Sequence, residues 1–482
     1  MNPAATPQGV AARGPQQPAR MSAFLRERWA WLALAAILAV AAALRLVDLG
    51  TRPANLTADE LDDLQNAYRV LAGTADGFFG LDWNQAPNLN VYLKAASVEV
   101  FGDAVAGARM YGVVLSLASL ALFYPLARRR LAPLPSLLAL FLLATSLWFL
   151  HFSRTPWVAM SAVLASVLTA YLLDLALAKG DPRLFALLGA AVAFGAYGYF
   201  AGRTLAPTVA VCFVVAVLLR EALRPGSGQT GALTLLRGFA LSGVVALLLV
   251  APQLKTQLER WDYANTRPRA ISIFSVEGEY LGDESKAEII LHQTQRMLRG
   301  FLLLDSAVVN RGLWARHHPK DWAFLDRTTG VLYWIGLGAG VYYWRRYAYW
   351  WPFLLVPLFI TQVFSIGTPD GSRGLIAAPF MFLFVGLGIE TLLSLARGVR
   401  WRRAAAAGAV ALALGIGAFN VDRYFDWVQE PAALKARAPS VDVAEFVYWR
   451  EAARERAERG RLLSFEAWLR YRESVLGPPG QP

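Results

Sequence analysis

The sequence predicts an all-α polytopic membrane protein of about eleven transmembrane helices, within a range of roughly 10 to 13. Of the 482 residues, 56% are hydrophobic and only 17% are charged, whereas a soluble domain has about 25% charged residues. The apolar residues are also gathered into blocks of roughly 17 to 25 residues, which is the length of a helix that crosses a bilayer. Composition and block length together exclude a soluble globular protein.

The first apolar block covers residues 29–47 and is predicted to be a retained span. It is too long for the apolar core of a signal peptide, and it lacks a small-residue cleavage site. The other predicted spans are 107–127, 132–150, 157–178, 184–201, 205–219, 234–252, 330–345, 349–366, 374–396 and 404–420. The domain plan is therefore a disordered cytoplasmic tail (1–28), a transmembrane domain (29–420), and a charged helical tail on the outer side (421–482).

Basic residues recur at every second connection between the spans, and this pattern fixes the orientation. Such connections face the cytoplasm under the positive-inside rule. They include Arg26 and Arg28, Arg128 to Arg130, Lys179 and Arg183, Arg220 and Arg224, Arg345 and Arg346, and the cluster from Arg397 to Arg403. The net charge of +12 is thus explained by membrane topology and does not indicate a nucleic-acid partner. The N-terminus is predicted to be cytoplasmic, with long outer segments at 49–106 and 252–330.

Cysteine and motif content narrow the possible classes further. The single cysteine, Cys212, excludes an intrachain disulfide and a cysteine-based metal cluster. No phosphate-binding glycine loop and no HExxH zinc motif occurs in the sequence. In the second outer segment, PRAISIFS indicates an extended piece, and residues 288–304 indicate an amphipathic helix.

The stretch NLTADELDDLQNAYRV in the first outer segment packs four carboxylates, Asp59, Glu60, Asp62 and Asp63, into five positions. The spacing of its apolar residues predicts an interfacial helix with a polar face. Thr57 and Glu60 fit a capping box, which is a purely structural explanation. That explanation leaves Asp59 unused at a helix start, where the helix dipole keeps a carboxylate ionised, as a general base or a cation ligand requires.

Three short outer connections each carry one arginine: Arg154, Arg203 and Arg373. A single arginine at a span end often only extends toward the lipid headgroups. Three in successive short outer loops predict a shared anionic ligand, because guanidinium groups bind phosphate through paired hydrogen bonds. Tyr197 and Tyr199 lie beside Arg203, where they either line a sugar pocket or anchor the membrane interface.

These residues resemble the GT-C fold glycosyltransferases that use polyprenyl-phosphate sugars, in the bacterial branch similar to protein mannosyltransferases and aminoarabinose transferases. The resemblance covers roughly residues 29–391 and rests on five ordered matches. They are the acidic pair Asp59-Glu60 after the first span, the run APNLNVYLKAASVEVFGDAVAGARMYGVVLSLAS, and the segments HFSRTPW, GAYGYFAGRTLAP and SRGLIAAPFMFLFVGLGIETL. One departure is Asn88-Leu89-Asn90, which stands where the family has a second proline and aromatic residues.

The resemblance implies transfer of a sugar from a polyprenyl-phosphate donor to an acceptor hydroxyl at the outer face of the bacterial inner membrane. Asp59 is then the catalytic base, with Glu60 as its helper or as the helix cap. Arg154, Arg203 and Arg373 would hold the donor phosphate. A divalent cation, Mg²⁺ or Mn²⁺, is an open possibility, with Asp59, Glu60 and Asp82 as candidate ligands. The acceptor is left open between protein, lipid and glycan.

Three alternatives remain. A transporter or flippase of lipid-linked glycans would place charges within its spans and show paired broken helices in two halves, and neither is evident here. A ligase or polymerase of surface glycans would use the same lipid carriers. A structural scaffold would use the acidic segment to bind a partner.

Overall fold

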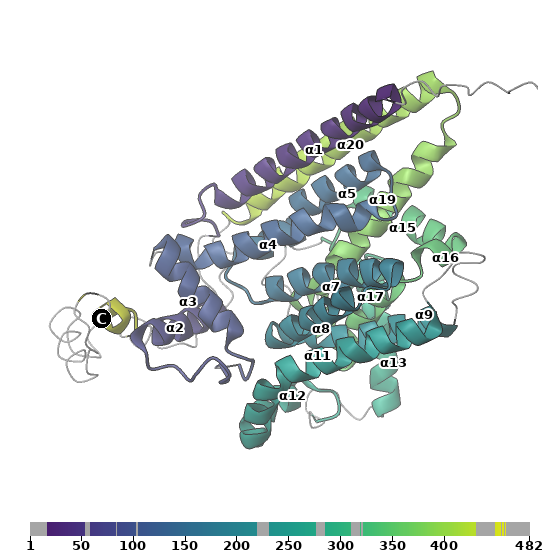
Figure 1. Cartoon of the computed structure of the whole chain (residues 1–482). Coiled ribbons are helices and arrows are strands. Elements are labelled where there is room, and N and C mark those ends of the chain that lie inside the picture. Colours follow the sequence, from purple (N-terminus) through teal and green to yellow (C-terminus); the bar gives the residue numbers. More distant parts are fainter. Residues whose placement is uncertain are drawn as a thin grey trace, which may run out of the picture.

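The computed structural model describes residues 17–53, 58–82, 84–102, 105–218, 231–275, 285–309, 319, 322–429, 449–454, 456 and 458. These residues are helical apart from loops and two isolated bridges, Leu81 with Pro87 and Ser272 with Ser365. The helices are α1 (Gln17–Leu46), α2 (Ala58–Ala72), α3 (Leu89–Phe101), α4 (Val105–Arg128), α5 (Pro133–Thr145), α6 (Leu147–Ser153), α7 (Ala159–Lys179), α8 (Pro182–Tyr197), η1 (Phe200–Thr204), α9 (Leu205–Leu218), α11 (Ala232–Glu259), α12 (Trp261–Ile271), α13 (Lys286–Met297), η2 (Leu298–Leu302), α14 (Ser306–Val309), α15 (Arg327–Tyr342), α16 (Trp344–Tyr347), α17 (Trp350–Leu358), η4 (Phe359–Val363), α18 (Gly371–Gly374), η5 (Leu375–Ala377), α19 (Ala378–Leu395) and α20 (Val399–Trp427). The all-α prediction is confirmed (Figure 1).

Within the described residues, seven helices are long and apolar enough to cross a membrane, or eight if the bent pair α5 and α6 forms one span. The chain is therefore a multi-pass membrane protein. Each segment predicted as a span falls on helical structure, but α8 and α15 have 16 residues each and α17 has nine. Such helices fall short of the roughly 20 residues that a straight crossing needs, so by length alone the count stays below the predicted one.

Two predicted boundaries differ from the helices. α1 begins at Gln17 rather than at Trp29, so part of the segment predicted as a disordered tail is helical, while residues 1–16 lie outside the described residues. α20 continues to Trp427, beyond the predicted end of the last span. The segment predicted to be extended is helical as far as Ile271, after which Ser272 forms an isolated bridge with Ser365 and residues 273–275 form a turn.

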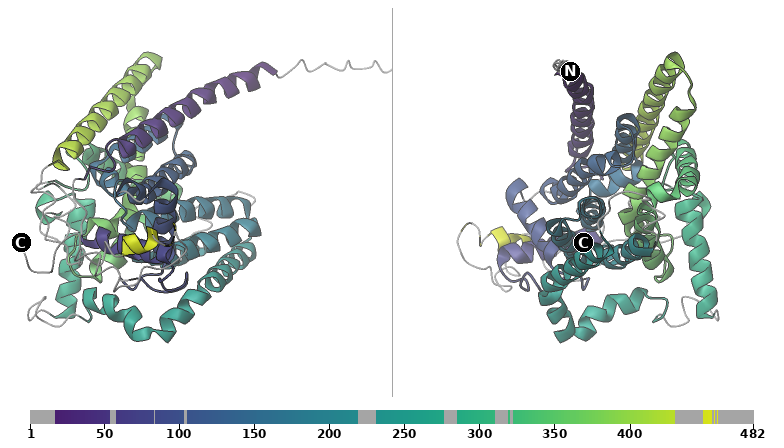
Figure 2. Two further views of the ribbon diagram at one scale, coloured as in Figure 1. Left: turned by 90° about the vertical axis from the view of Figure 1, so that its left-hand side faces the viewer. Right: turned by 45° about the vertical axis from the view of Figure 1, so that its right-hand side comes forward.

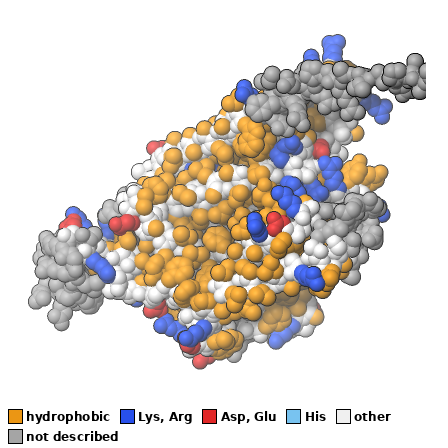
Figure 3. Space-filling view, viewed as in Figure 1, with side chains coloured by type: hydrophobic (Ala, Val, Ile, Leu, Met, Phe, Trp, Pro, Cys, Tyr) orange, Lys and Arg blue, Asp and Glu red, His pale blue; other side chains and the backbone are white. Residues whose placement is uncertain are grey.

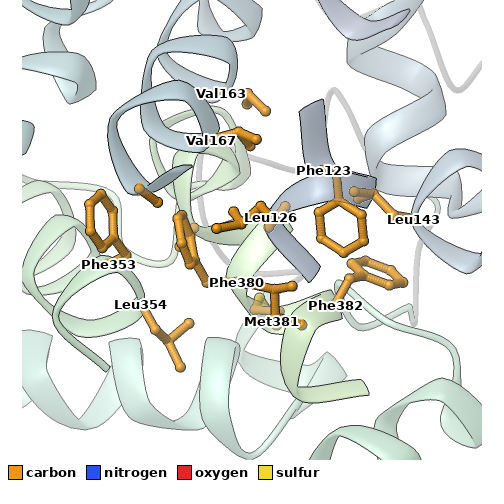
Figure 4. Close-up of a cluster of buried hydrophobic side chains, with 14 of the residues drawn as sticks. Phe123, Leu126, Leu143, Val163, Val167, Phe353, Leu354, Phe380, Met381 and Phe382 are labelled. Carbon is orange, nitrogen blue, oxygen red and sulfur yellow. The ribbon is translucent and has the colours of Figure 1, made fainter. Parts of the chain in front are cut away.

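The helices form a bundle with α19 at its centre (Figures 1 and 2). In the 18-residue apolar windows of the spans, 83% of the residues are buried around α19 but only 22% in α1 and 17% in α11. Phe380, Met381 and Phe382 of α19 pack among apolar side chains of α4, α5, α7 and α17 (Figure 4). The peripheral helices instead expose large apolar side chains, as helices in contact with lipid do.

Close packing of α15 against α19 depends on glycine. A Cβ at Gly336 would overlap the carbonyl oxygen of Phe384, and a Cβ at Gly388 would overlap the carbonyl oxygen of Leu332. Small residues allow helix backbones to approach closely inside a membrane. The glycines therefore set the distance between these two helices.

Gly336→Ala is expected to lower the free energy of unfolding by about 1–3 kcal/mol, because the added methyl group forces α15 away from α19. Thermal unfolding of the purified chain in detergent measures the change. Gly338→Ala is the matched control, since a Cβ at Gly338 meets no atom within 4 Å. Equal unfolding temperatures for the two variants would contradict this account of the packing.

The two ends of the bundle differ in charge. At one end, on the right in Figure 3, basic side chains gather. Arg129 and Arg130 pair there with Asp174, and Arg346 donates a hydrogen bond to the Arg130 carbonyl. At the opposite end lie α2, α3 and α12 (Figure 1). This second end is called the α2 end below, and it holds the cavities that follow.

Candidate active site

A cavity of about 410 Å³ opens at the α2 end of the bundle. Six separate segments contribute to its wall: α2, the loop before α3, the connection between α6 and α7, the η1 region, α12, and the segment from η4 to α18. Its charged and polar lining residues are Asp63, Asp82, Asn84, Gln85, Tyr199, Arg203, Thr204, Arg267, Ser272, Thr361, Ser365, Asp370, Ser372 and Arg373. The cavity therefore combines three guanidinium groups with three carboxyl groups, and it lies within the size range of small-molecule sites.

Arg373 is fixed in the wall of this cavity before any ligand arrives. Asp370 caps the short helix α18 by accepting hydrogen bonds from the amides of Ser372 and Arg373. The Arg373 guanidinium donates to the Ser365 hydroxyl at 2.7 Å and to the Ile366 carbonyl at 2.6 Å, and its Nε lies 3.3 Å from Asp370 Oδ2. A buried guanidinium held by several partners loses less side-chain entropy when it binds an anion than a freely rotating one does.

Arg203 and Arg267 line the same cavity but are held differently. Both side chains are exposed, and neither has a hydrogen bond or an ion pair with another residue that the structure describes. Arg203 belongs to η1, and Arg267 belongs to α12. Two guanidinium groups in one cavity that have no hydrogen bond or ion pair with another described residue form a site for an anion with several oxygen atoms, such as a phosphate.

The carboxyl groups of the cavity have defined partners. Asp63 forms a buried ion pair with Lys94 of α3. Asp82 Oδ1 accepts hydrogen bonds from the backbone amides of Asn84 and Ala86 at 2.9 and 2.8 Å. Burial, together with the nearby negative charge of Asp63, raises the pKa of Asp82 to about 7. Asp82 can therefore exchange a proton near neutral pH.

The structure brings three of the residues singled out as substrate ligands to this cavity, namely Arg203, Arg373 and Tyr199. The Tyr199 hydroxyl lies 3.3 Å from the Ser372 hydroxyl, which places it next to Arg373. Tyr197 is outside the cavity, and its hydroxyl donates to the Leu249 carbonyl at 2.8 Å. Its placement fits the alternative of an interface anchor.

Arg154 also lies outside the cavity. Its guanidinium is fully buried and donates to the backbone carbonyls of Leu44, Val47 and Arg52 at 2.5, 2.6 and 3.1 Å. These carbonyls belong to the C-terminal end of α1 and the turn that follows it. Arg154 therefore secures the start of the first outer segment, and we leave it out of the phosphate site.

The acidic pair lies in the first turn of α2. Glu60 is buried and interacts electrostatically with Arg109 of α4. The side chain of Asp59 lies outside the described residues. Asp59 precedes Asp63 by four positions, and residues four apart share one face of a helix.

The residues that the structure describes contain no group of three or more His, Cys, Asp or Glu side chains that could hold a metal ion. Of the three candidate ligands, Asp82 lines the cavity, Glu60 does not, and the Asp59 side chain is outside the description. The described residues alone thus do not fit a divalent cation, and the mechanism below uses none.

Residues 85–254 match the family described as dolichyl-phosphate-mannose-protein mannosyltransferase. The fold agrees with that match over most of the chain. Archaeal oligosaccharyltransferase AglB from Archaeoglobus fulgidus, solved with an inhibitory peptide and a dolichol-phosphate, superposes with a TM-score of 0.54 at 13% identity. The chain therefore has the fold of the GT-C glycosyltransferases, and its match to the mannosyltransferase family lies within residues 85–254. The resemblance to GT-C fold glycosyltransferases that the sequence predicts is thereby confirmed.

The aligned share of each protein differs between AglB and a second solved structure, ArnT. The AglB alignment covers 91% of this chain and 60% of AglB, so the chain spans only part of the length of AglB. ArnT from Cupriavidus metallidurans bound to undecaprenyl phosphate gives a TM-score of 0.53 at 14% identity, over 89% of this chain and 77% of ArnT. No curated protein sequence matches this chain.

Sequence reasoning missed Arg267, Asp63 and Asp370 as residues of the cavity. Arg267 directly precedes the segment 268–275 that the sequence predicts to be extended, and its place on a helix face follows only from the observed helix α12. A signal was present, because Tyr263, Arg267 and Ile271 recur at a spacing of four, as residues on one helix face do. For Asp370, the signal was its position three residues before Arg373.

Proposed function

We propose that the chain transfers a sugar from a polyprenyl-phosphate donor to an acceptor hydroxyl at the outer face of the bacterial inner membrane. The observation that carries this proposal is the convergence of three guanidinium groups in one cavity: Arg373 is held by hydrogen bonds, whereas Arg203 and Arg267 have no hydrogen bond or ion pair with another described residue. The donor class is supported by the dolichol-phosphate in the AglB structure and the undecaprenyl phosphate in the ArnT structure. The donor phosphate would occupy the space among the three guanidinium groups.

The proposed reaction is a displacement at the anomeric carbon of the donor. The acceptor oxygen forms a bond to this carbon, the bond from the carbon to the phosphate oxygen breaks, and the acceptor proton passes to a carboxylate. We assign that carboxylate to Asp59, with Glu60 supporting the helix start. The guanidinium groups stabilise the negative charge that grows on the departing polyprenyl phosphate.

The proposed topology keeps about eleven crossings, with α8, α15 and α17 as short or tilted spans and with the N-terminus in the cytoplasm. The basic end of the bundle then faces the cytoplasm, and the cavity faces the outer side. The two alternative functions that use the same lipid carriers differ in chemistry. A ligase or polymerase of surface glycans would use the same phosphate site. A flippase would release its cargo with the phosphate bond intact.

The double variant Arg203→Gln/Arg267→Gln is expected to weaken binding of undecaprenyl phosphate at least roughly tenfold, because two charge-assisted hydrogen-bond donors are lost. Binding is measured for the purified full chain in lipid nanodiscs, with undecaprenol as the ligand that lacks the phosphate. Lys255→Gln/Arg269→Gln removes the same charge from exposed positions of α11 and α12 and serves as the control. Equal affinity for undecaprenyl phosphate in both double variants would exclude the proposed phosphate site.

A further inference from the structure

A second cavity of about 270 Å³ lies beside the first at the α2 end. Both cavities are lined by Asp82, which therefore belongs to the wall between them. α12 runs along both, because Tyr263 lines the second cavity and Arg267, one helical turn later, lines the first. A group bound in the second cavity is thus next to the proposed donor site.

The second cavity has a polar and internally braced wall. Arg260 forms an ion pair with Asp76 at 2.5 Å, and the Tyr263 hydroxyl donates to the Asp82 carbonyl at 2.8 Å. Asn88 Nδ2 donates to the Gly77 carbonyl at 3.0 Å. The Arg260 and Tyr263 contacts join the start of α12 to residues 76–82, and the Asn88 contact holds the loop before α3, so the wall is formed by protein contacts and does not need a ligand to form.

Arg69 is the lining cation whose charge is not used internally. Its Nε is buried without a hydrogen-bond partner, and it has no ion pair among the described residues. Its guanidinium lies over the ring of Trp449 at 5.3 Å, in segment 449–454, which packs against α2 (Figure 2). An aromatic ring orients a guanidinium but does not neutralise it, and a buried donor without a partner costs stability. The position therefore favours an anionic group in the cavity.

The Asp82 carboxyl group is held at the wall between the two cavities in a way that leaves one of its oxygen atoms available to a ligand. Oδ1 is occupied by two backbone amides, whereas Oδ2 has no hydrogen bond with another described residue. A carboxyl oxygen with one side fixed in this way can accept a hydrogen bond from a hydroxyl group at the junction of the two cavities. Asn66 of α2 and Asn88 add donors and acceptors suited to further hydroxyl groups.

We propose that the second cavity binds the head of the acceptor substrate, a hydroxyl-rich group of about monosaccharide size that carries a negative charge. Arg69 binds the charge, Asn66 binds hydroxyl groups, and Asp82 orients the reacting hydroxyl toward the donor site. This inference rests on the proposed function and names the acceptor class that the function leaves open. The volume lies just below the roughly 300–1,000 Å³ of typical small-molecule pockets, and its polar wall does not suit an aliphatic chain.

The test uses glucuronate and glucose as probes, because they differ by the carboxylate. Binding of each to the full chain in nanodiscs is measured by saturation-transfer NMR for the wild type, Arg69→Gln and Asn66→Ala. Glucuronate is expected to bind more tightly than glucose. Arg69→Gln should weaken glucuronate roughly tenfold and leave glucose nearly unchanged, and Asn66→Ala should weaken both. Arg269→Gln, at an exposed position of α12, is the control and should change neither.

Undecaprenyl phosphate binding in the same samples separates this inference from the proposed function. If Arg69→Gln keeps that binding and loses glucuronate, the second cavity is a distinct acceptor site. The inference is overturned if glucuronate does not bind the wild type, binds no better than glucose, or is unaffected by Arg69→Gln. If the wild type does not bind undecaprenyl phosphate, the proposed function is refuted, whether or not glucuronate binds.

Discussion

Asp59→Asn is expected to lower sugar transfer by about 10²–10⁴-fold, because an amide cannot take the proton of the attacking hydroxyl. The change preserves size and removes one charge, so insertion into the membrane should be normal. Transfer is measured with a polyprenyl-phosphate sugar donor and membranes that supply the acceptor, at equal amounts of folded protein.

Asp262→Asn is the matched control for this variant. Asp262 lies on α12 at the same end of the bundle, and its side chain is 95% exposed. Its replacement should leave transfer unchanged. Full transfer by Asp59→Asn would remove Asp59 from the mechanism, and Asp63 and Asp82 would then be the acids to test within the cavity.

Arg154→Met is expected to lower the free energy of unfolding by about 3 kcal/mol or more. The variant leaves the carbonyls of Leu44, Val47 and Arg52 without their buried donor, and each such loss costs about 1–3 kcal/mol. The measurement is thermal unfolding of the purified chain in detergent, combined with undecaprenyl phosphate binding per folded molecule. We expect unfolding at a lower temperature and unchanged binding.

Arg203→Met is the control, and for it we expect the opposite changes in stability and binding. Arg203 has no hydrogen bond with another described residue. It should unfold near the wild-type temperature and bind undecaprenyl phosphate more weakly. If Arg154→Met kept its stability and lost undecaprenyl phosphate binding, Arg154 would belong to the phosphate site after all.

The overall class and helix α2 could be predicted from the sequence, because both depend on local patterns. The length of the apolar blocks predicts a membrane protein, and the helical spacing of the apolar residues in the first outer segment predicts α2. The number of spans was less predictable, since helices such as α8 and α15 end before they reach full membrane length. The residue at which such a helix ends depends on how the helix packs against its neighbours. The hydropathy of one segment carries no information about that packing.

The arginines show where sequence reasoning stops. Arg154 and Arg203 look alike in the sequence, as lone cations at span ends. In the structure, the Arg154 guanidinium donates hydrogen bonds to backbone carbonyls more than a hundred residues earlier in the chain, whereas the Arg203 side chain lines the cavity. Only the tertiary fold decides between these environments. The same holds for Arg267, which reaches the cavity because α12 lies across the α2 end.

The most direct test of the central claim is the fate of the donor. A panel of undecaprenyl-phosphate sugars is incubated with the purified chain and with membranes from the source organism that lack this chain, and undecaprenyl phosphate is quantified by mass spectrometry. We predict release of undecaprenyl phosphate from at least one donor with the wild type, and loss of that release with Asp59→Asn and with Arg203→Gln/Arg267→Gln. Failure to release undecaprenyl phosphate from any donor, or transport of a donor across the membrane with its sugar still attached, would contradict a glycosyltransferase mechanism.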